Sequence, residues 1–524
     1  MVTQASPSVI RPVTPGDLSL GRYGKLGQSS AADTQAWHDV FLDIIAAGGG
    51  TVRVPPGVLQ IESPAILTAD MGTSDVNGIS ILGSGRSRTV FETQSGLFDW
   101  RQASARDIGF LARDLSVSMA AGGNNGDIFY LEQVEGGISR QEDAVFENIA
   151  IWPKDRTVDY FTNGIVAKNL FWPTVRGSQI ANPYGPGVST ATQHQGNACI
   201  NVDGSYGPQI IDTKCWGAAR GISYVVTANP GGEGGLVRNC VLDSDVGLYA
   251  ESAGTEPGLD IIQTHFNCAA KGIHLVRKKL VKIRDCLMYA EEADTYTDIA
   301  LENCQDVSIS NMTFFFVGNT SRTNVSADAS CARVQSNALH HLADGTAYSL
   351  AGSDHQIINP YYGAALDTRV VNTSAGLVVK HLKPNRVRAV LSANAAVSNA
   401  TPTTVTWDTT SIEEEGNWVG ATPYETFVVP ANAGINRIKA RANIQWTNNS
   451  TGGRECWFTV GGVRVEGIGQ SRQLAAGSSY QSVETAELDV VGGEVIRLIV
   501  QQDSGVSLNI VPGPATWIEI AAVG

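Results

Sequence analysis

The chain has 524 residues, and its 56 Gly against only 5 Met favour strands and turns over helices. Hydrophobic residues make up 43% and charged residues 17%, so the chain can bury a large core, and the composition argues against intrinsic disorder. The net charge of −14 argues against a general nucleic-acid surface, and no run approaches about 18 apolar residues, which argues against membrane insertion.

Residues 1–20 form the first segment, which is rich in Pro and Ser and has little periodicity. This segment lacks the basic and apolar regions of a secretory signal, so the sequence predicts no such signal. We expect a short arm that attaches the protein to a larger assembly.

The next segment predicts one amphipathic helix followed by a short strand. Asp33 is expected to cap the helix. The apolar residues that share one helix face are Ala36, Trp37, Val40, Phe41, Ile44 and Ile45. Gly48 to Gly50 would end the helix, and residues 51–54 alternate as a strand does.

The string from Asp33 to Gly57 resembles the N-terminal motif of pectate-lyase-like right-handed β-helices, which are common among phage tailspike depolymerases. The matching pieces are Asp33-Thr34, Ala46-Ala47-Gly48-Gly49-Gly50 and Thr51-Val52-Arg53-Val54-Pro55-Pro56-Gly57. In that family the helix covers the open end of the solenoid, where apolar surface and strand edges would otherwise be exposed. The chain departs from the family at Ala32, where an acidic residue is usual.

Residues 51–385 repeat short β-rich pieces and predict a right-handed parallel β-helix. One repeated register is apolar, polar, Asn or Asp or Ser, small, apolar: Val145–Ala150, Val237–Leu242, Ile283–Met288 and Val307–Met312. In a second repeat, a glycine is followed by an apolar residue, any residue and another apolar residue. This repeat occurs at Gly221–Tyr224, Gly247–Ala250 and Gly272–Leu275. Cysteines recur about once per coil, at Cys199, Cys215, Cys240, Cys268, Cys286 and Cys304. With no CxxC or CxxxxH spacing, the cysteines predict buried reduced thiols, and the sequence predicts no metal site and no cofactor.

Residues 386–524 change to the alternation of antiparallel strands and resemble a jelly-roll of the C1q/tumour-necrosis-factor type. The resemblance lies in the order of Tyr424–Phe427, Pro430, Gly434, the segment 492–496 and the terminal aromatic strand around Trp517. That family implies a trimer. The fold class is therefore all-β: a capped parallel β-helix with a C-terminal antiparallel jelly-roll sandwich, homotrimeric.

The three modules together resemble a phage tailspike, which implies a place in the virion tail. The implied domains are an arm at 1–20, a β-helix body at 21–385 and a trimerisation or glycan-binding domain at 386–524. The implied partners are a bacterial surface polysaccharide, a tail or baseplate protein bound through the arm, and two further copies of the chain.

Glycoside hydrolysis needs two carboxylates. Asp243 and Asp245 are separated by one residue, so on a strand they would share a face about 6–7 Å apart. Glu251 follows one short strand later and could act as the acid. On this pair alone, hydrolysis is preferred.

A polysaccharide lyase would instead need a base and a group that neutralises a uronate carboxylate. His265, His274, Arg277 and Tyr289 could supply them, and the stretch 277–284 holds five basic residues in an acidic chain. The lyase therefore stays an alternative, as does a receptor-binding tail fibre without enzymatic activity.

Sugar rings stack on aromatic side chains, and long loops on a rigid solenoid often carry function. The residues expected to bind substrate are Trp172, Tyr184, Trp216, Tyr249 and Arg277. Tyr184 belongs to a polar insertion at 181–197.

Overall fold

The structure is a computed structural model of the chain. It describes residues 17–23, 26–67, 78–102, 109–120, 124–133, 144–183, 195–226, 233–253, 257–290, 296–315, 321–342, 344–362, 368–380, 386–413, 418, 424–430, 435–466, 469–474 and 480–523. Two compact units are formed, one by residues 1–355, 363–367 and 373–375, and one by residues 356–362, 368–372 and 376–524. Each unit is described by itself.

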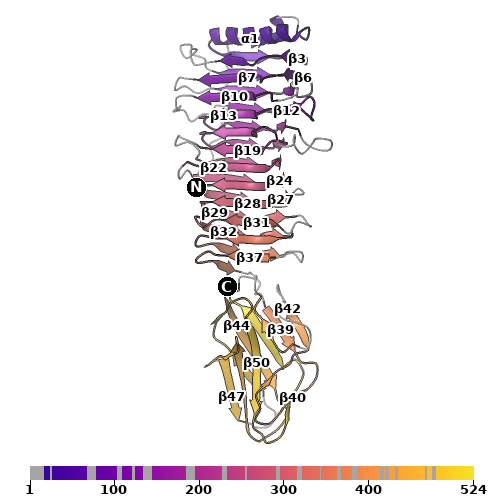
Figure 1. Cartoon of the computed structure of the whole chain (residues 1–524), viewed down its shortest axis with the longest axis vertical. Helices are drawn as coiled ribbons and strands as arrows, with labels where there is room; N and C mark the ends of the chain where they lie inside the picture. Colours follow the sequence, from indigo (N-terminus) through magenta and orange to yellow (C-terminus); the bar gives the residue numbers. More distant parts are fainter. Residues whose placement is uncertain are drawn as a thin grey trace. The chain divides into compact units, whose positions relative to one another are not determined.

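Three stacks of parallel strands build the β-helix (Figure 1). Sheet A contains β1 (Asp17–Ser19), β2 (Gly50–Arg53), β5 (Ile79–Leu82), β8 (Phe110–Arg113), β11 (Ala144–Glu147), β14 (Thr174–Arg176), β17 (Gln209–Ile211), β20 (Leu236–Arg238), β23 (Pro257–Ile262), β26 (Lys279–Arg284), β29 (Gln305–Ser310), β32 (Ala332–Asn337), β35 (Gln356–Ile358) and β38 (Val378–Lys380).

Sheet B contains β3 (Gly57–Ile61), β6 (Thr89–Thr93), β9 (Ser116–Met119), β12 (Ala150–Pro153), β15 (Gln179–Ala181), β18 (Lys214–Trp216), β21 (Val241–Asp243), β24 (His265–Cys268), β27 (Leu287–Ala290), β30 (Thr313–Phe314), β33 (His340–His341) and β36 (Tyr361–Tyr362). Sheet C contains β4 (Ala65–Leu67), β7 (Phe98–Gln102), β10 (Asp127–Gln133), β13 (Asn163–Lys168), β16 (Ala198–Asp203), β19 (Arg220–Val225), β22 (Val246–Glu251), β25 (Lys271–Val276), β28 (Tyr296–Glu302), β31 (Arg322–Ala327), β34 (Thr346–Leu350) and β37 (Thr368–Asn372). From β2 to β37 each coil contributes one strand to each sheet, and sheet A also contains β1 and β38.

The expected parallel β-helix is confirmed, since the three sheets fit a right-handed β-helix. The Asn or Asp of the first repeat lies at the corner where the chain passes from sheet A to sheet B, and the backbone conformation there explains the choice of residue. Asn148, Asn239, Asp285 and Asn311 have φ of 51, 53, 57 and 51°, a left-handed conformation that short polar side chains tolerate best. All eight cysteines are free and buried.

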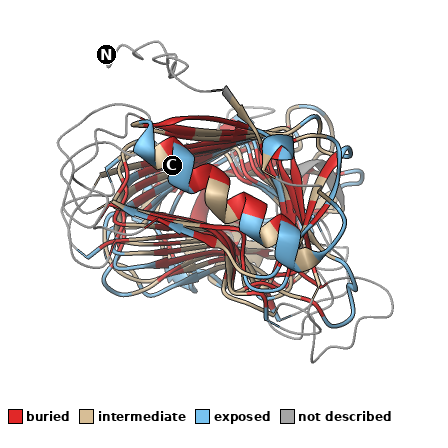
Figure 2. Cartoon of the chain, turned by 90° about the horizontal axis from the view of Figure 1, so that it is seen from above, coloured by how far each residue is buried: buried red, intermediate tan, exposed pale blue. Residues whose placement is uncertain are grey.

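The N-terminal end of the solenoid is covered by α1 (Ser30–Ala46), which follows the short 3₁₀ turn η1 (Leu20–Arg22). Figure 2 shows α1 lying across the sheets. Trp37 and Phe41 are buried, and their rings contact Phe91 and Phe98 inside the first coils. The helix therefore covers apolar surface that the first coil would otherwise expose.

The prediction that Asp33 caps this helix is wrong. The helix begins earlier, and the Ser29 hydroxyl accepts from the Ala32 N–H at 3.2 Å as its cap. Asp33 is 1% exposed and instead accepts from the backbone N–H groups of Gly27 at 2.8 Å and Gln60 at 2.9 Å. This carboxylate joins α1 to the chain before it and to β3.

The C-terminal sheets are antiparallel, as expected of the sandwich. One sheet contains β39 (Arg386–Val390), β42 (Thr409–Glu413), β44 (Arg437–Gln445), β48 (Tyr480–Glu484), β49 (Leu488–Asp489) and β52 (Trp517–Ala522). The other contains β41 (Thr403–Thr404), β43 (Phe427–Val428), β45 (Gly453–Val460), β46 (Val463–Arg464), β47 (Gln470–Leu474) and β50 (Val495–Gln502), and β40 (Ala395–Val397) pairs with β51 (Leu508–Ile510).

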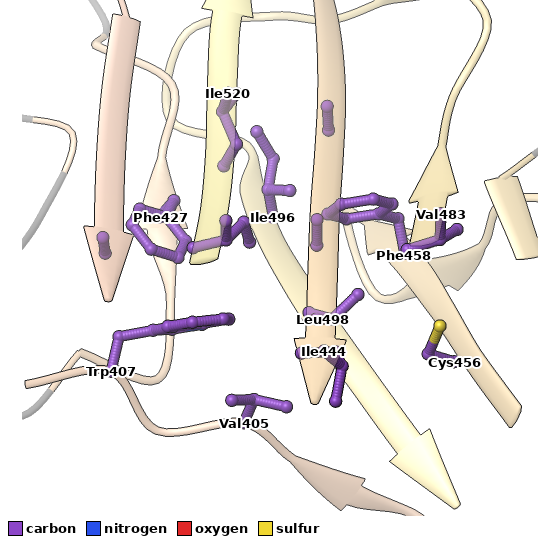
Figure 3. Close-up of a cluster of buried hydrophobic side chains, with 14 of the residues drawn as sticks. Val405, Trp407, Phe427, Ile444, Cys456, Phe458, Val483, Ile496, Leu498 and Ile520 are labelled. Carbon is purple, nitrogen blue, oxygen red and sulfur yellow. The ribbon is translucent and has the colours of Figure 1, made fainter. Parts of the chain in front are cut away.

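The core of this unit contains side chains from both sheets. Trp407 and Phe427 lie at one side of the cluster, and Phe458 and Ile496 lie among its strands (Figure 3). Because successive residues of a strand point to opposite faces, the alternating burial of β44 and β50 gives each sheet one core face and one outer face.

Candidate functional site

The outer face of sheet C carries a cluster of charged and aromatic side chains over β19, β22, β25 and β28. Parallel register stacks Tyr249 beside His274, and it places Glu251 beside Val276 and Glu302 beyond it. The alternation of each strand turns these side chains outward, while Leu248, Ala250, Ile273 and Leu275 are buried in the solenoid.

Tyr249 lies at the centre of this cluster. Its hydroxyl donates to Glu251 Oε2 at 2.5 Å, and the Arg220 guanidinium lies over its ring, 4.0 Å from the centroid. Glu251 Oε1 also accepts from Arg277 Nη2 at 2.5 Å. Arg277 follows β25 at the corner toward sheet A, where its Nε donates to the Ser252 carbonyl at 2.6 Å. Glu251 is therefore held between a phenol and a guanidinium.

His274 forms the second half of the cluster. Its ring packs edge-to-face against Tyr249 with centroids 5.2 Å apart, and its Nε2 lies 2.7 Å from Glu302 Oε1. Lys271 Nζ lies 3.4 Å from both ring nitrogens and 3.9 Å from Glu302 Oε1. Donation from Nε2 to Glu302 leaves the lone pair of the neutral imidazole on Nδ1, where Lys271 Nζ can donate to it.

Burial gives Tyr249 and His274 opposite chemical roles. Burial and the hydrogen bond to Glu251 raise the pKa of Tyr249 to about 12, so it keeps its proton at neutral pH. Burial lowers the pKa of His274 below its ordinary value, Lys271 lowers it further, and the hydrogen bond with Glu302 opposes both. The pair therefore offers a protonated phenol beside a neutral imidazole.

We call these residues the sheet C cluster: Arg220, Tyr249, Glu251, Lys271, His274, Arg277 and Glu302. It brings together four residues singled out in the sequence: Tyr249, Glu251 and Arg277, and His274 from the lyase alternative. Arg220, Lys271 and Glu302 were not assigned to the site. Arg220 and Lys271 precede the glycines of two aligned repeats, which is the signal that could have found them.

Asp243 and Asp245 do not share a strand. β21 ends at Asp243 and β22 begins at Val246, so Asp245 lies in the turn between sheets B and C. Asp243 faces outward on sheet B, where its Oδ2 accepts from Asn267 Nδ2 at 3.1 Å. The spacing argument, which assumed one continuous strand, therefore does not apply, and Glu251 lies on a different sheet from Asp243.

The remaining predicted residues are spread around the solenoid. Trp216 lies beside Asp243 on sheet B, and Tyr289 lies further along that sheet, with its ring stacked near Phe315. Trp172 lies in the turn between β13 and β14 and is 36% exposed. Tyr184 lies outside the described residues.

His265 lies apart from the sheet C cluster, in an open depression of about 540 Å³ at the corner of sheets A and B. Burial lowers its pKa as well. The depression is lined by Asp212, Arg238, Asn239, Gln263, Thr264, His265, Asp285 and Leu287.

Within the described part of the chain, no group of three or more His, Cys, Asp or Glu is placed to hold a metal ion. In the same residues, no helix is long and apolar enough to cross a membrane.

No family model and no curated protein matches this sequence. Solved structures do match it. The tailspike protein of E. coli bacteriophage HK620, in a mutant form, is 9% identical over 93% of each chain, with a TM-score of 0.47. The A-module of the Azotobacter vinelandii mannuronan C-5 epimerase AlgE6 is 12% identical over 69% of this chain and 99% of its own, with a TM-score of 0.45.

Murine APRIL is 12% identical over 27% of this chain and 100% of its own, with a TM-score of 0.21. Because these identities are so low, the chemistry of the site has to follow from the residues of this chain.

Proposed function

We propose that the chain is a tailspike-type enzyme that binds and cleaves a bacterial surface polysaccharide at the sheet C cluster. The observation that carries this proposal is the presence of a neutral imidazole, a protonated phenol and two cations, Arg220 and Lys271, on one outward sheet face, with Arg277 at the adjoining corner. The order of a capped β-helix and a C-terminal antiparallel sandwich supports the tailspike part. Glycan binding would need an open face of this kind.

This set of groups matches β-elimination at a uronate sugar. Nδ1 of His274 would take the proton at C5, next to the carboxylate, while Lys271 or Arg277 neutralises that carboxylate. Tyr249 would give its proton to the glycosidic oxygen as the C4–O bond breaks, which leaves a C4=C5 double bond on one product. Glu302 would orient His274, and Glu251 would orient Tyr249.

Hydrolysis is the second candidate. The preference for it rested on Asp243 and Asp245, which the turn after β21 separates from a common strand. Glu251 and Glu302 replace them as a possible pair, because they occupy the same position two coils apart, which separates their backbones by about 9.5 Å. That spacing approaches the range of inverting enzymes, about 6.5–9.5 Å between carboxyl groups. Both carboxylates face donors or cations, so neither is placed as the proton donor.

The chemistry of the products tests this proposal. Host surface polysaccharide incubated with the protein should become shorter, gain reducing ends and gain ultraviolet absorbance from the new double bond. Shortening with reducing ends but without absorbance would select hydrolysis. Binding without shortening would contradict the enzymatic proposal and favour a receptor-binding fibre.

We also propose that the chain assembles as a homotrimer in a virion tail and that the predicted arm joins it to a tail or baseplate protein. Residues 1–16 of the arm lie outside the described residues, and residues 17–20 do not belong to it, because Asp17–Ser19 form β1 of sheet A and Leu20 is buried. Trimerisation would protect exposed strand edges, and a C-terminal jelly-roll of the predicted type would promote it.

A further inference from the structure

The basic stretch 277–284 separates into three environments. Lys278 is completely buried, with its Nζ 4.6 Å from the centroid of the Tyr224 ring, so it does not belong to a solvated face. Arg277 turns toward Glu251 in the sheet C cluster. Lys279, Lys282 and Arg284 lie on β26, where the last two alternate with buried Val281 and Ile283 and are exposed on sheet A.

The acidic side chains around β26 neutralise it only in part. Asp260 lies in register with Lys282, and Asp285 lies 3.9 Å from Arg284. Asp306 is bound by Arg333, whose Nε lies 2.6 Å from its Oδ1, and the positive charges of Arg333 and Lys279 both lower the pKa of this carboxyl. Among the described residues, no ion pair or side-chain hydrogen bond is found for Lys279 or Lys282. Two cations of this strip are thus available to a ligand.

The strip continues the sheet C cluster around one coil. Lys271 begins β25 on sheet C, Arg277 stands at the corner, and Lys279, Lys282 and Arg284 follow on sheet A. Beyond Arg284, the neighbouring Asp285 lines the depression at the corner of sheets A and B, which also contains Asp212 and Arg238. One coil therefore presents a row of cations that starts at the proposed active site on sheet C, passes a corner and ends on sheet A at Arg284.

We propose that this coil is a binding track for an acidic polysaccharide, which crosses the solenoid along β25 and β26 instead of following its axis. This inference rests on the proposed function and adds to it the charge of the substrate and the path of the polymer. Charge complementarity favours a polyanion because the remainder of the chain is strongly acidic and would repel it elsewhere. The track would bind sugars beyond the one that reacts.

The test is equilibrium binding of fluorescent polygalacturonate and of hyaluronate at low and at moderate salt, with dextran as the neutral probe. The triple variant Lys279→Gln, Lys282→Gln, Arg284→Gln should bind the acidic polymers about ten-fold more weakly and depend less steeply on salt. The matched control Lys154→Gln, Arg176→Gln, Lys214→Gln removes three exposed cations from other coils and should bind like the wild type.

The outcomes separate this inference from the proposed function. The track would be overturned if both triple variants lost the same amount of affinity for the acidic polymers. It would also be overturned if the wild type bound neither acidic polymer at low salt. If the wild type cleaves host polysaccharide and the β26 variant binds and cleaves normally, the function stands and the track is wrong. If the β26 variant binds the acidic polymers more weakly but the wild type cleaves no polymer, the track is supported and the enzymatic proposal is wrong.

Discussion

His274→Ala is expected to lower kcat by about 10²–10⁴-fold, because it removes the proposed base while leaving the cations that hold the polymer. KM should change far less than kcat. Tyr249→Phe keeps the ring beneath Arg220 and removes only the proton donor, so it should lose kcat in the same way. Steady-state kinetics on host polysaccharide give both constants.

The matched control is His265→Ala. This histidine also has a pKa lowered by burial, but it lies on β24 in sheet B, away from the sheet C cluster. It should leave turnover unchanged. A large loss in His265→Ala together with normal turnover in His274→Ala would move the reaction to the corner of sheets A and B.

The same account predicts the pH profile of the wild type. The base must be neutral, so kcat/KM should fall as the pH drops through the lowered pKa of His274, below the ordinary histidine value of 6.5. Tyr249 keeps its proton up to about pH 12, so no loss from this group is expected between pH 7 and pH 10.

Arg322→Met is expected to cost about 3–5 kcal/mol of stability, because it leaves a buried carboxylate without its counter-charge. Arg322 and Asp298 are both completely buried inside the solenoid and are joined by two hydrogen bonds, of 2.8 and 2.6 Å. Asn324 donates to the same carboxylate at 2.8 Å, and its Oδ1 lies 2.8 Å from His341 Nδ1. Urea unfolding of the wild type and the variant measures the loss.

The control is the double variant Asp298→Leu, Arg322→Met, which replaces the pair with apolar side chains. It should recover much of the stability, because no unpaired charge remains in the core. A double variant less stable than Arg322→Met would show that the pair stabilises the fold by more than the avoidance of a buried charge.

Much of the fold could be predicted because its repeats are local. The Asn or Asp at several corners of sheets A and B tolerates a left-handed backbone, and at two of these corners the next residue, Cys240 or Cys286, is buried in the solenoid. The buried face of α1 around Trp37 and Phe41 could also be predicted, because the spacing of its apolar residues is local. Asp33 was misread as a cap because its partners, Gly27 and Gln60, are set by tertiary contacts that a helix pattern does not contain.

The site could be predicted only in part. Asp243 and Asp245 looked like a pair because the sequence does not show that β21 stops between them. Tyr249 and His274 meet because two glycine repeats align one coil apart, a register that the repeats imply. Glu302 lies two coils away from Glu251 and does not precede a repeated glycine, so no local sequence pattern predicts that it belongs to the site.

The most direct test of the central claim is a crystal structure of His274→Ala soaked with an acidic oligosaccharide released from the host polysaccharide. We predict that the sugar lies on the outer face of sheet C, with a carboxylate at Lys271 or Arg277 and its glycosidic oxygen near the hydroxyl of Tyr249. An oligosaccharide bound instead on sheet B, over Trp216 and Asp243, would contradict it.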